Sequence, residues 1–433
     1  MEVEPACPVE VEPTPMEVEV EVEPTPNVWE DAPDNILLRV AAFLPFRLDR
    51  LRMCSVNPHW RRALCGWGQG RPPQLPLLPP LAPLLPWLVF PNTEEPSLFC
   101  AMDRISYPLR LPRDVRNARF CGSCEGGWFL LALDMRPTQY ALYNLYFGHR
   151  IPVPGGLTIP DDTGAGNRPL VLRAATFTSS PTAAGPNGYM IGAIALVCAK
   201  WCAAFWREGL PNWITSESDD LWMSRPPQDV KFVGGAFFFI TADENIVTYC
   251  PTLAGDENQF VMRRFDCDML QRDGYADDLQ GNASIARYLV DSRGVLHMVL
   301  RYIYNNQGTT RFRVFKFQVL PQLVDGVPPP ASATWVSVSE LDGQMLFLGR
   351  GCSRSIEVEQ FLGFDFEGST IYFPDDRFIP NPEPTVDNRR SYSFIDMGKY
   401  SLQQDGKGAL QPWPPVDRRP ARSDRAPPTW WLH

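Results

Sequence analysis

The chain has 433 residues, 44% of them hydrophobic, which suffices for one large domain with a small accessory module. Its net charge of −10 is concentrated at the N-terminus, because the first 26 residues carry eight Glu and no Lys or Arg, leaving −2 for the rest. Residues 27–433 are therefore nearly neutral and offer no excess of positive charge to a phosphate backbone, so nucleic-acid binding is not expected.

The cysteines and the apolar stretches indicate in which cellular compartment the protein is expected. The eleven cysteines are scattered and odd in number, and the start has neither the basic nor the apolar region of a secretory leader. We therefore expect reduced thiols and a cytoplasmic and/or nuclear location. Residues 75–91 contain six prolines, and residues 189–206 are interrupted by Lys200, so neither apolar stretch is expected to span a membrane.

The chain opens with a low-complexity segment. The sequence VEVEPTP occurs at residues 9–15 and again at 20–26. Alternating Glu and Val at residues 17–23 would place like charges on one face of a strand, and Pro flanks both ends of this stretch. Residues 1–26 are therefore predicted to be a disordered acidic tail.

Residues 27–68 show helical spacing. Pro33 suits the start of a helix that Pro45 ends, and its apolar residues fan over a face wider than one packed neighbour needs. A second stretch supplies the predicted core partners Leu48, Leu51, Val56 and Trp60. So short a module seldom buries enough surface alone, and its spare apolar face is expected to be covered by another protein.

Residues 69–96 are rich in Gly and then in Pro, and are predicted to be a semi-rigid, partly polyproline linker. From residue 97 to 433 short apolar strands alternate with polar turns. Hairpins are predicted for 128–133 with 140–147, for 192–197 with 201–206, for 229–233, 236–241 and 245–250, and for 286–291, 295–303 and 311–319. Further strands are predicted at 334–340, 345–349, 369–374, 392–397 and 400–402. About fifteen short strands without a strict period favour an irregular β-propeller in a mainly β chain.

Two stretches carry a family resemblance. Residues 32–45 (APDNILLRVAAFLP) and 51–61 (LRMCSVNPHWR) resemble the F-box, with a Pro near the start, a Leu/Ile ladder, a closing Leu-Pro, and a Val four residues before a Trp. The resemblance implies a three-helix F-box at residues 27–68 that docks on a Skp-type adaptor and through it on a cullin. It also implies the adaptor-contacting residues Pro33, Ile36, Leu37, Val40, Leu44 and Pro45.

The remainder is similar to the KIB-type propeller domain that follows many plant F-boxes. The similarity rests on residues 121–154, on Trp213 followed by residues 229–249, on residues 340–358 and 369–376, and on the closing PPTWW at 427–431. This resemblance implies that residues 97–433 form a propeller that recognises a target protein.

Candidate catalytic groups are sparse. Only four histidines occur, and His297 lies within a strand pattern, where packing is the expected role. Cys121 and Cys124 form a lone CxxC with no second pair or His pair nearby, so a zinc or redox site is disfavoured. Four acidic doublets fall in turn-rich segments and are predicted to be solvated loop residues: Asp161-Asp162, Asp219-Asp220, Asp277-Asp278 and Asp375-Asp376. We predict no catalytic residue, no metal and no cofactor.

Three functions remain to be distinguished. The first is a non-enzymatic substrate-recognition subunit of an SCF-type cullin E3 ubiquitin ligase, whose F-box binds the adaptor and whose propeller binds an unidentified target protein. The second is a propeller protein-binding module or kinase inhibitor with a vestigial F-box. The third, a propeller hydrolase using paired carboxylates, is disfavoured by the scarcity of His and the loop position of the Asp doublets.

Overall fold

The computed structural model describes two separate units, residues 1–82 and 83–433. The described residues are 29–44, 53–54, 56–65, 85–91, 94–133, 139–145, 148–158, 168–184, 188–215, 225–254, 259–280, 282–304, 307–320, 332–361, 364–376, 394–402, 408–420 and 427–432. The predicted tail and most of the predicted linker lie outside them.

The first unit contains α1 (Asp34–Phe43) and α3 (Pro58–Cys65). Asn57 caps α3, since its Oδ1 accepts a hydrogen bond from the Trp60 amide at 2.7 Å, and Pro58 occupies the first helical position, where a missing N–H costs nothing. Trp60 Nε1 donates to the Trp29 carbonyl at 2.8 Å, and His59 Nε2 to that of Ala32 at 2.8 Å, fastening the segment before α1 to α3. Between them Met53, Cys54 and Val56 are also helical, but the residues around them are only partly described, so a three-helix F-box is not confirmed.

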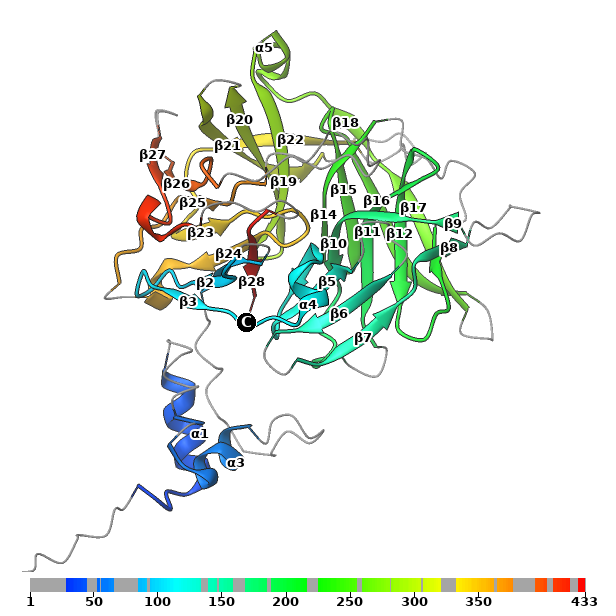
Figure 1. The fold of residues 1–433 in the computed structure, drawn as a ribbon. Helices are drawn as coiled ribbons and strands as arrows, with labels where there is room; N and C mark the ends of the chain where they lie inside the picture. Colours follow the sequence, from blue (N-terminus) through cyan, green and yellow to red (C-terminus); the bar gives the residue numbers. More distant parts are fainter. Residues whose placement is uncertain are drawn as a thin grey trace, which may run out of the picture. The chain divides into compact units, whose positions relative to one another are not determined.

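The second unit is a six-bladed β-propeller, as counted over its described residues (Figure 1). We number the blades in chain order. Blade 1 has the strand order β28-β1-β2-β3, with β28 (Thr429–Trp431), β1 (Trp87–Phe90), β2 (Ser97–Phe99) and β3 (Ser106–Pro108). Blade 2 has β4 (Arg119–Cys124), β5 (Trp128–Ala132), β6 (Tyr140–Asn144) and β7 (Arg150–Val153).

The two central blades of the sequence follow. Blade 3 has the order β10-β11-β12-β13-β8-β9, with β8 (Gly156–Thr158), β9 (Arg168–Pro169), β10 (Val171–Phe177), β11 (Met190–Val197), β12 (Lys200–Arg207) and β13 (Trp213–Ile214). Blade 4 is a meander of β14 (Pro227–Val233), β15 (Ala236–Thr241), β16 (Ile246–Ala254) and β17 (Gln259–Asp266).

The last two blades each contain a parallel strand pair. Blade 5 has the order β18-β22-β21-β20-β19, with β18 (Asp268–Leu270), β19 (Ser284–Ser292), β20 (Val295–Tyr304), β21 (Gly308–Val319) and β22 (Ser332–Val338). Blade 6 has the order β24-β23-β25-β26-β27, with β23 (Gln344–Phe347), β24 (Arg354–Glu357), β25 (Thr370–Phe373), β26 (Gly398–Ser401) and β27 (Ala409–Pro412). The helical turns are α4 (Arg113–Arg116), α5 (Tyr275–Gln280), η2 (Val358–Phe361) and η3 (Val416–Arg418).

The ring is closed by the last strand of the chain. β28 pairs antiparallel with β1, so that Trp431 lies opposite Trp87 and Trp430 opposite Leu88. Trp430 is fully buried, and its Nε1 donates to the Leu348 carbonyl of blade 6 at 2.5 Å. Because residues from both ends of the propeller complete blade 1, the ring has no unpaired gap between its first and last blades.

Aromatic pairs fill the spaces between blades. Phe205 of blade 3 lies 5.4 Å from Phe237 of blade 4, measured between ring centroids, and Phe347 of blade 6 lies 5.2 Å from Trp430 of blade 1. Gly192 in β11 permits the first contact, because a Cβ there would lie 2.4 Å from the Phe237 ring. The core therefore runs round the ring between neighbouring sheets.

The predicted strands agree with this arrangement except in two places, but many strands were not predicted, among them β3, β10 and β17. The predicted hairpins correspond to β5–β6, β11–β12, β14–β16 and β19–β21. The predicted linker at 69–96 is wrong at its end, because Trp87–Phe90 form β1; Pro86 is tolerated since it precedes the strand. The strand predicted at 392–397 lies partly outside the described residues, and 394–397 are not a strand.

Candidate binding site at the mouth of the propeller

A loop of blade 6 closes the middle of the ring. Residues 349–353, which we call the plug loop, approach β10 so closely that a Cβ on Gly351 would lie 2.2 Å from the Ala175 carbonyl oxygen. The Gly351 amide donates to Asp229 Oδ1 of blade 4 at 2.6 Å, and Lys231 Nζ of the same blade donates to the Ser353 carbonyl at 2.6 Å. The loop thereby separates two cavities along the axis.

Two buried charges on β14 hold the plug loop. Asp229 is fully buried and accepts from the amides of Val230 and Gly351 through Oδ1 and of Leu289 through Oδ2. Burial raises the pKa of Asp229 to about 6, although these hydrogen bonds oppose the rise. Burial also lowers the pKa of Lys231 to about 8, aided by Arg354 and opposed by Asp229. The pair ties blades 4, 5 and 6 together at the axis.

The larger cavity, which we call the wide mouth, has a volume of about 300 Å³ and is lined by residues from all six blades. The chain leaves β4, β10, β14, β19 and β28 beside it, and each blade contributes at least one lining residue: Leu432, Ser123, Thr176, Lys231, Asp291 and Arg354. Further hydroxyls come from Thr178, Ser179 and Ser180, and Arg354 pairs with Glu125 at 3.0 Å. The wide mouth therefore presents hydrogen-bond donors, acceptors and both signs of charge.

The thiols at the axis are not activated. Cys352 lines both cavities, and burial raises its pKa to about 11, so it remains a protonated thiol at neutral pH. Burial likewise raises the pKa of Cys121 and of Cys124. In the part of the chain that the structure describes, no group of three or more His, Cys, Asp or Glu side chains is arranged to hold a metal ion.

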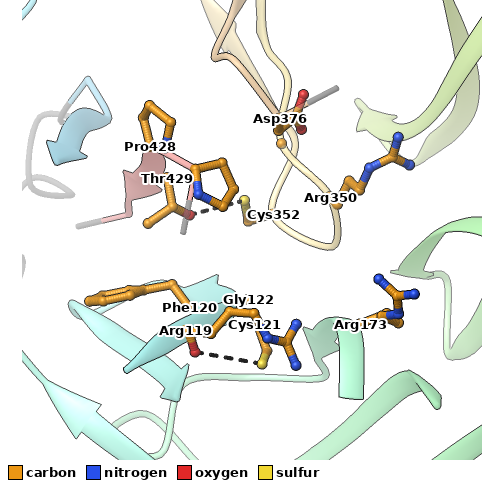
Figure 2. Close-up of a pocket in the computed structure, with 12 residues that line it drawn as sticks. Arg119, Phe120, Cys121, Gly122, Arg173, Arg350, Cys352, Asp376, Pro428 and Thr429 are labelled. Atoms are coloured by element: carbon orange, nitrogen blue, oxygen red, sulfur yellow. Dashed lines mark hydrogen bonds between the residues drawn. The ribbon is translucent and has the colours of Figure 1, made fainter. Parts of the chain in front are cut away.

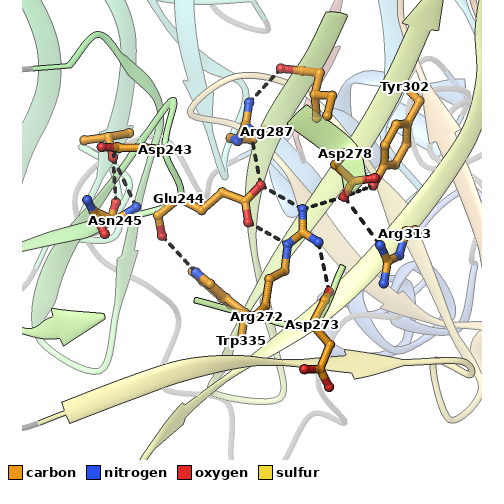
Figure 3. A network of polar contacts seen from close by, with 12 residues as sticks. Asp243, Glu244, Asn245, Arg272, Asp273, Asp278, Arg287, Tyr302, Arg313 and Trp335 are labelled. Carbon is orange, nitrogen blue, oxygen red and sulfur yellow. Dashed lines mark hydrogen bonds and ion pairs between the residues drawn. The ribbon is translucent and has the colours of Figure 1, made fainter. Parts of the chain in front are cut away.

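Three residues of the acidic doublets are buried, which corrects the prediction that they are solvated: Asp278, Asp375 and Asp376, whereas Asp277 is exposed as predicted. Asp278 on α5 is 8% exposed; it accepts from Arg272 at 2.7 Å and from the Tyr302 hydroxyl at 2.7 Å (Figure 3). Glu244 joins the same network, bound by Arg272 through two nitrogens and by Arg287 at 3.1 Å. Since Glu244 lies between β15 and β16, this network fastens blade 4 to blade 5.

The doublet Asp375-Asp376 is also buried, at 2% and 6% exposure. Asp376 Oδ1 accepts from the Tyr288 hydroxyl at 2.6 Å and from Arg301 at 3.1 Å, joining blades 5 and 6. Asp278 and Asp376 are buried because arginines from other segments pair with them, Arg301 with Asp376 and Arg313 with Asp278. The other two doublets, at 161–162 and 219–220, lie outside the described residues.

The predicted adaptor-contacting residues are distributed over exposed and buried positions of the first unit. Ile36 and Val40 on α1 are 37% and 38% exposed, and Pro33 is exposed. Leu37 is fully buried and Leu44 is half-buried, while Pro45 lies outside the described residues. One face of α1 therefore keeps branched apolar side chains at the surface.

The predicted F-box core residues are only partly described. Trp60 is half-buried against the Trp29 segment, whereas Leu48 and Leu51 lie outside the described residues. Val56 differs from the prediction, because its side chain is 59% exposed. It immediately precedes Asn57, the residue that caps α3.

His297 lies in β20, half-buried, with its Nδ1 2.9 Å from the Val295 carbonyl oxygen. Burial lowers its pKa. The neutral ring therefore packs in the strand as expected. Among the described residues, no helix is long and apolar enough to cross a membrane.

The six sheets, the closing strand and the polar wide mouth define a β-propeller of the protein-binding class. A model of the KIB1-4 beta-propeller matches residues 97–401, and the chain belongs to this family. No curated protein matches the sequence.

Several solved structures share a weak likeness. The β-propeller domain of Myceliophteria thermophila Cps50 (Swd1) is 14% identical, with 52% of this chain and 69% of that chain covered and a TM-score of 0.27. BBS1N, solved in complex with ARL6DN, is 10% identical over 54% and 67%, with a TM-score of 0.27. The dihydro-heme d1 dehydrogenase NirN, solved in complex with DHE, is 10% identical over 91% and 92%, with a TM-score of 0.25. These likenesses are too weak to bear on function.

Proposed function

We propose that this protein is the substrate-recognition subunit of an SCF-type cullin E3 ubiquitin ligase. In this proposal the first unit is an F-box that binds a Skp-type adaptor, and the wide mouth of the propeller binds a target protein. The ligase itself is completed by the partner subunits, so this chain performs no chemistry.

The supporting observation is the apolar face of α1. Ile36 and Val40 are exposed one turn apart, in a helix whose Leu37, Leu38 and Ala41 are buried. Fully burying such a side chain contributes about 1.5 to 3 kcal/mol, so two of them supply a useful share of a micromolar affinity. The resemblance of residues 32–45 and 51–61 to the F-box names the adaptor as the partner.

A pull-down with purified Skp-type adaptor tests the proposal. The full chain should bind with a dissociation constant of about 1 µM or tighter, and Val40→Asp should weaken binding by more than about 100-fold because a carboxylate would enter an apolar interface. Val336→Asp is the matched control, since Val336 is 41% exposed on β22 of the propeller and Val40 is 38% exposed. Equal binding by the two variants would refute the assignment of α1.

Failure of the wild-type chain to bind the adaptor near micromolar concentration would favour the second function, a propeller protein-binding module or kinase inhibitor with a vestigial F-box. Capture of partners by wild type and by Val40→Asp distinguishes the two units. The proposal expects the cullin and adaptor to be lost with the variant, while a target held by the propeller is retained. Loss of every partner would contradict this division of roles.

A further inference from the structure

The smaller cavity lies on the other side of the plug loop, where the chain enters β4, β10 and β28 (Figure 2). Its volume is about 60 Å³. At about 15 Å³ per water this space holds about four water molecules, or one tetrahedral oxyanion in their place. A peptide side chain with its backbone does not fit this space. The space suits a small ion.

Three arginines from three blades line this cavity: Arg119 of blade 2, Arg173 of blade 3 and Arg350 of blade 6 (Figure 2). Asp376 is the one carboxylate among the lining residues, and it is already paired with Arg301. The lining thus carries an excess of positive charge within a domain of nearly neutral sequence. Arginine is well suited to binding oxyanions, because the N–H groups of its planar guanidinium can donate two parallel hydrogen bonds to two oxygens of one anion.

Part of this polar lining is unsatisfied by the protein. Arg350 Nη1 donates to the Gln228 carbonyl, and its guanidinium lies 5.2 Å from the centroid of the Tyr288 ring, yet its Nε is buried with no hydrogen-bond partner among the described residues. Asp376 Oδ2 is likewise buried and without such a partner, on a side chain only 6% exposed. Buried polar atoms of native proteins are nearly always paired with protein, water or a ligand, so a polar occupant of this cavity is expected.

We propose that this cavity binds inorganic phosphate. The arginines supply donors to its oxygens, and Asp376 Oδ2 accepts from the hydroxyl that phosphate keeps at neutral pH. Sulfate has the same shape and no such hydrogen, so it leaves the Asp376 oxygen facing a negatively charged acceptor. The cavity is accordingly selective for phosphate over sulfate.

Thermal unfolding of the full chain is measured with 0.1 to 10 mM phosphate or sulfate, at ionic strength held constant with KCl. Phosphate should raise the unfolding temperature with a saturable dependence, and sulfate should do so at least about tenfold less effectively. This range lies below the concentrations at which such salts stabilise proteins by exclusion from the surface. A response no greater than that to KCl would overturn the proposal, and an equal response to sulfate would overturn the role of Asp376.

Calorimetric titration of Arg350→Gln and Arg173→Gln should give phosphate affinities lowered by at least about tenfold. Arg293→Gln is the control, because Arg293 is exposed and pairs with Glu357 outside this cavity. Should Arg350→Gln fail to fold, Arg173→Gln and the wild-type titration still decide the matter. Unchanged affinity in a folded arginine variant would assign the phosphate to another site.

Discussion

Arg301 offers the sharpest test of what holds the propeller together. Its guanidinium is fully buried between blades 5 and 6 and lies 4.5 Å from the centroid of the Phe373 ring. It donates to six acceptors at 2.7 to 3.3 Å: Thr309 Oγ1, the Tyr288 hydroxyl, the Pro374 carbonyl, Asp376 Oδ1, the Asp396 carbonyl and Asp396 Oδ2. One side chain thus neutralises two buried carboxylates.

Replacing Arg301 with Met keeps much of the apolar stem and removes the charge. Breaking one buried ion pair from one side costs about 3 to 5 kcal/mol, because the remaining charge stays buried without compensation. With two carboxylates left, Arg301→Met should lower the free energy of unfolding by about 4 kcal/mol or more. Arg293→Met, at an exposed ion pair with Glu357, should lower it by less than about 1 kcal/mol.

The loss should also depend on pH in a defined direction. Burial already raises the pKa of Asp376, and Arg301 is one of the groups that opposes this rise. Without Arg301 the folded-state pKa rises further, so the folded variant takes up a proton that the unfolded chain does not bind. The deficit relative to wild type should therefore be largest at neutral pH and shrink on acidification towards pH 5.

Urea unfolding followed by tryptophan fluorescence at pH 7 and pH 5 measures both effects. A loss below about 1 kcal/mol for Arg301→Met, equal to that of Arg293→Met, would refute the argument that this arginine compensates the carboxylates. A stability loss of Arg301→Met that grows as the pH falls would instead contradict the inference that the carboxylate of Asp376 is left charged and uncompensated.

Two further predictions concern the plug loop. Gly351→Ala should lower the free energy of unfolding by about 3 kcal/mol or more, because residue 351 has a φ of +71° and its new Cβ would clash with the Ala175 carbonyl oxygen. The control Gly234→Ala, at a φ of +58° with open space around it, should lower it by about 1 kcal/mol. Similar losses for the two variants in urea unfolding would contradict the close approach of Gly351 to β10. The pKa of Lys231 is about 8 in the folded state and 10.5 ordinarily, so the unfolded chain binds the Lys231 proton more tightly than the folded chain does. The free energy of unfolding of the wild type should therefore rise between pH 8 and pH 10.5, by up to about 3 kcal/mol relative to that of Lys231→Met. Parallel pH profiles of wild type and Lys231→Met would show that Lys231 is not perturbed by burial.

The local pattern of apolar runs and turn residues was sufficient to predict the β-hairpins. In residues 286–319 apolar runs are broken by turn residues such as Ser292-Arg293-Gly294, and the strands β19, β20 and β21 pair as this predicts. β1 was missed because prolines on both sides of Trp87–Phe90 outweighed four strand-forming residues. Its partner β28 lies at the other end of the domain, which no local pattern reveals.

The buried ion networks could have been suspected from one signal. Lys231, Arg287 and Arg301 each stand inside an otherwise apolar strand run, and a charge in such a position requires a buried partner. The identity of the partner was beyond sequence reasoning, because Asp376 follows Arg301 by 75 residues and comes from the next blade. The same limit applied to the two cavities, whose lining residues come from four or more blades each.

The plug loop determines where a partner can bind on the propeller. It crosses the axis at Gly351, where Asp229 and the backbone of Ala175 hold it, so the axis is not an open passage at this level. A macromolecule is therefore limited to the outer surfaces, and of the two cavities lined by described residues the wide mouth is the larger, with the polar groups that the proposed recognition of a protruding segment requires. Since every blade contributes to that mouth, its shape depends on closure of the ring by β28, so the contacts that stabilise the fold also set the geometry of the proposed binding site.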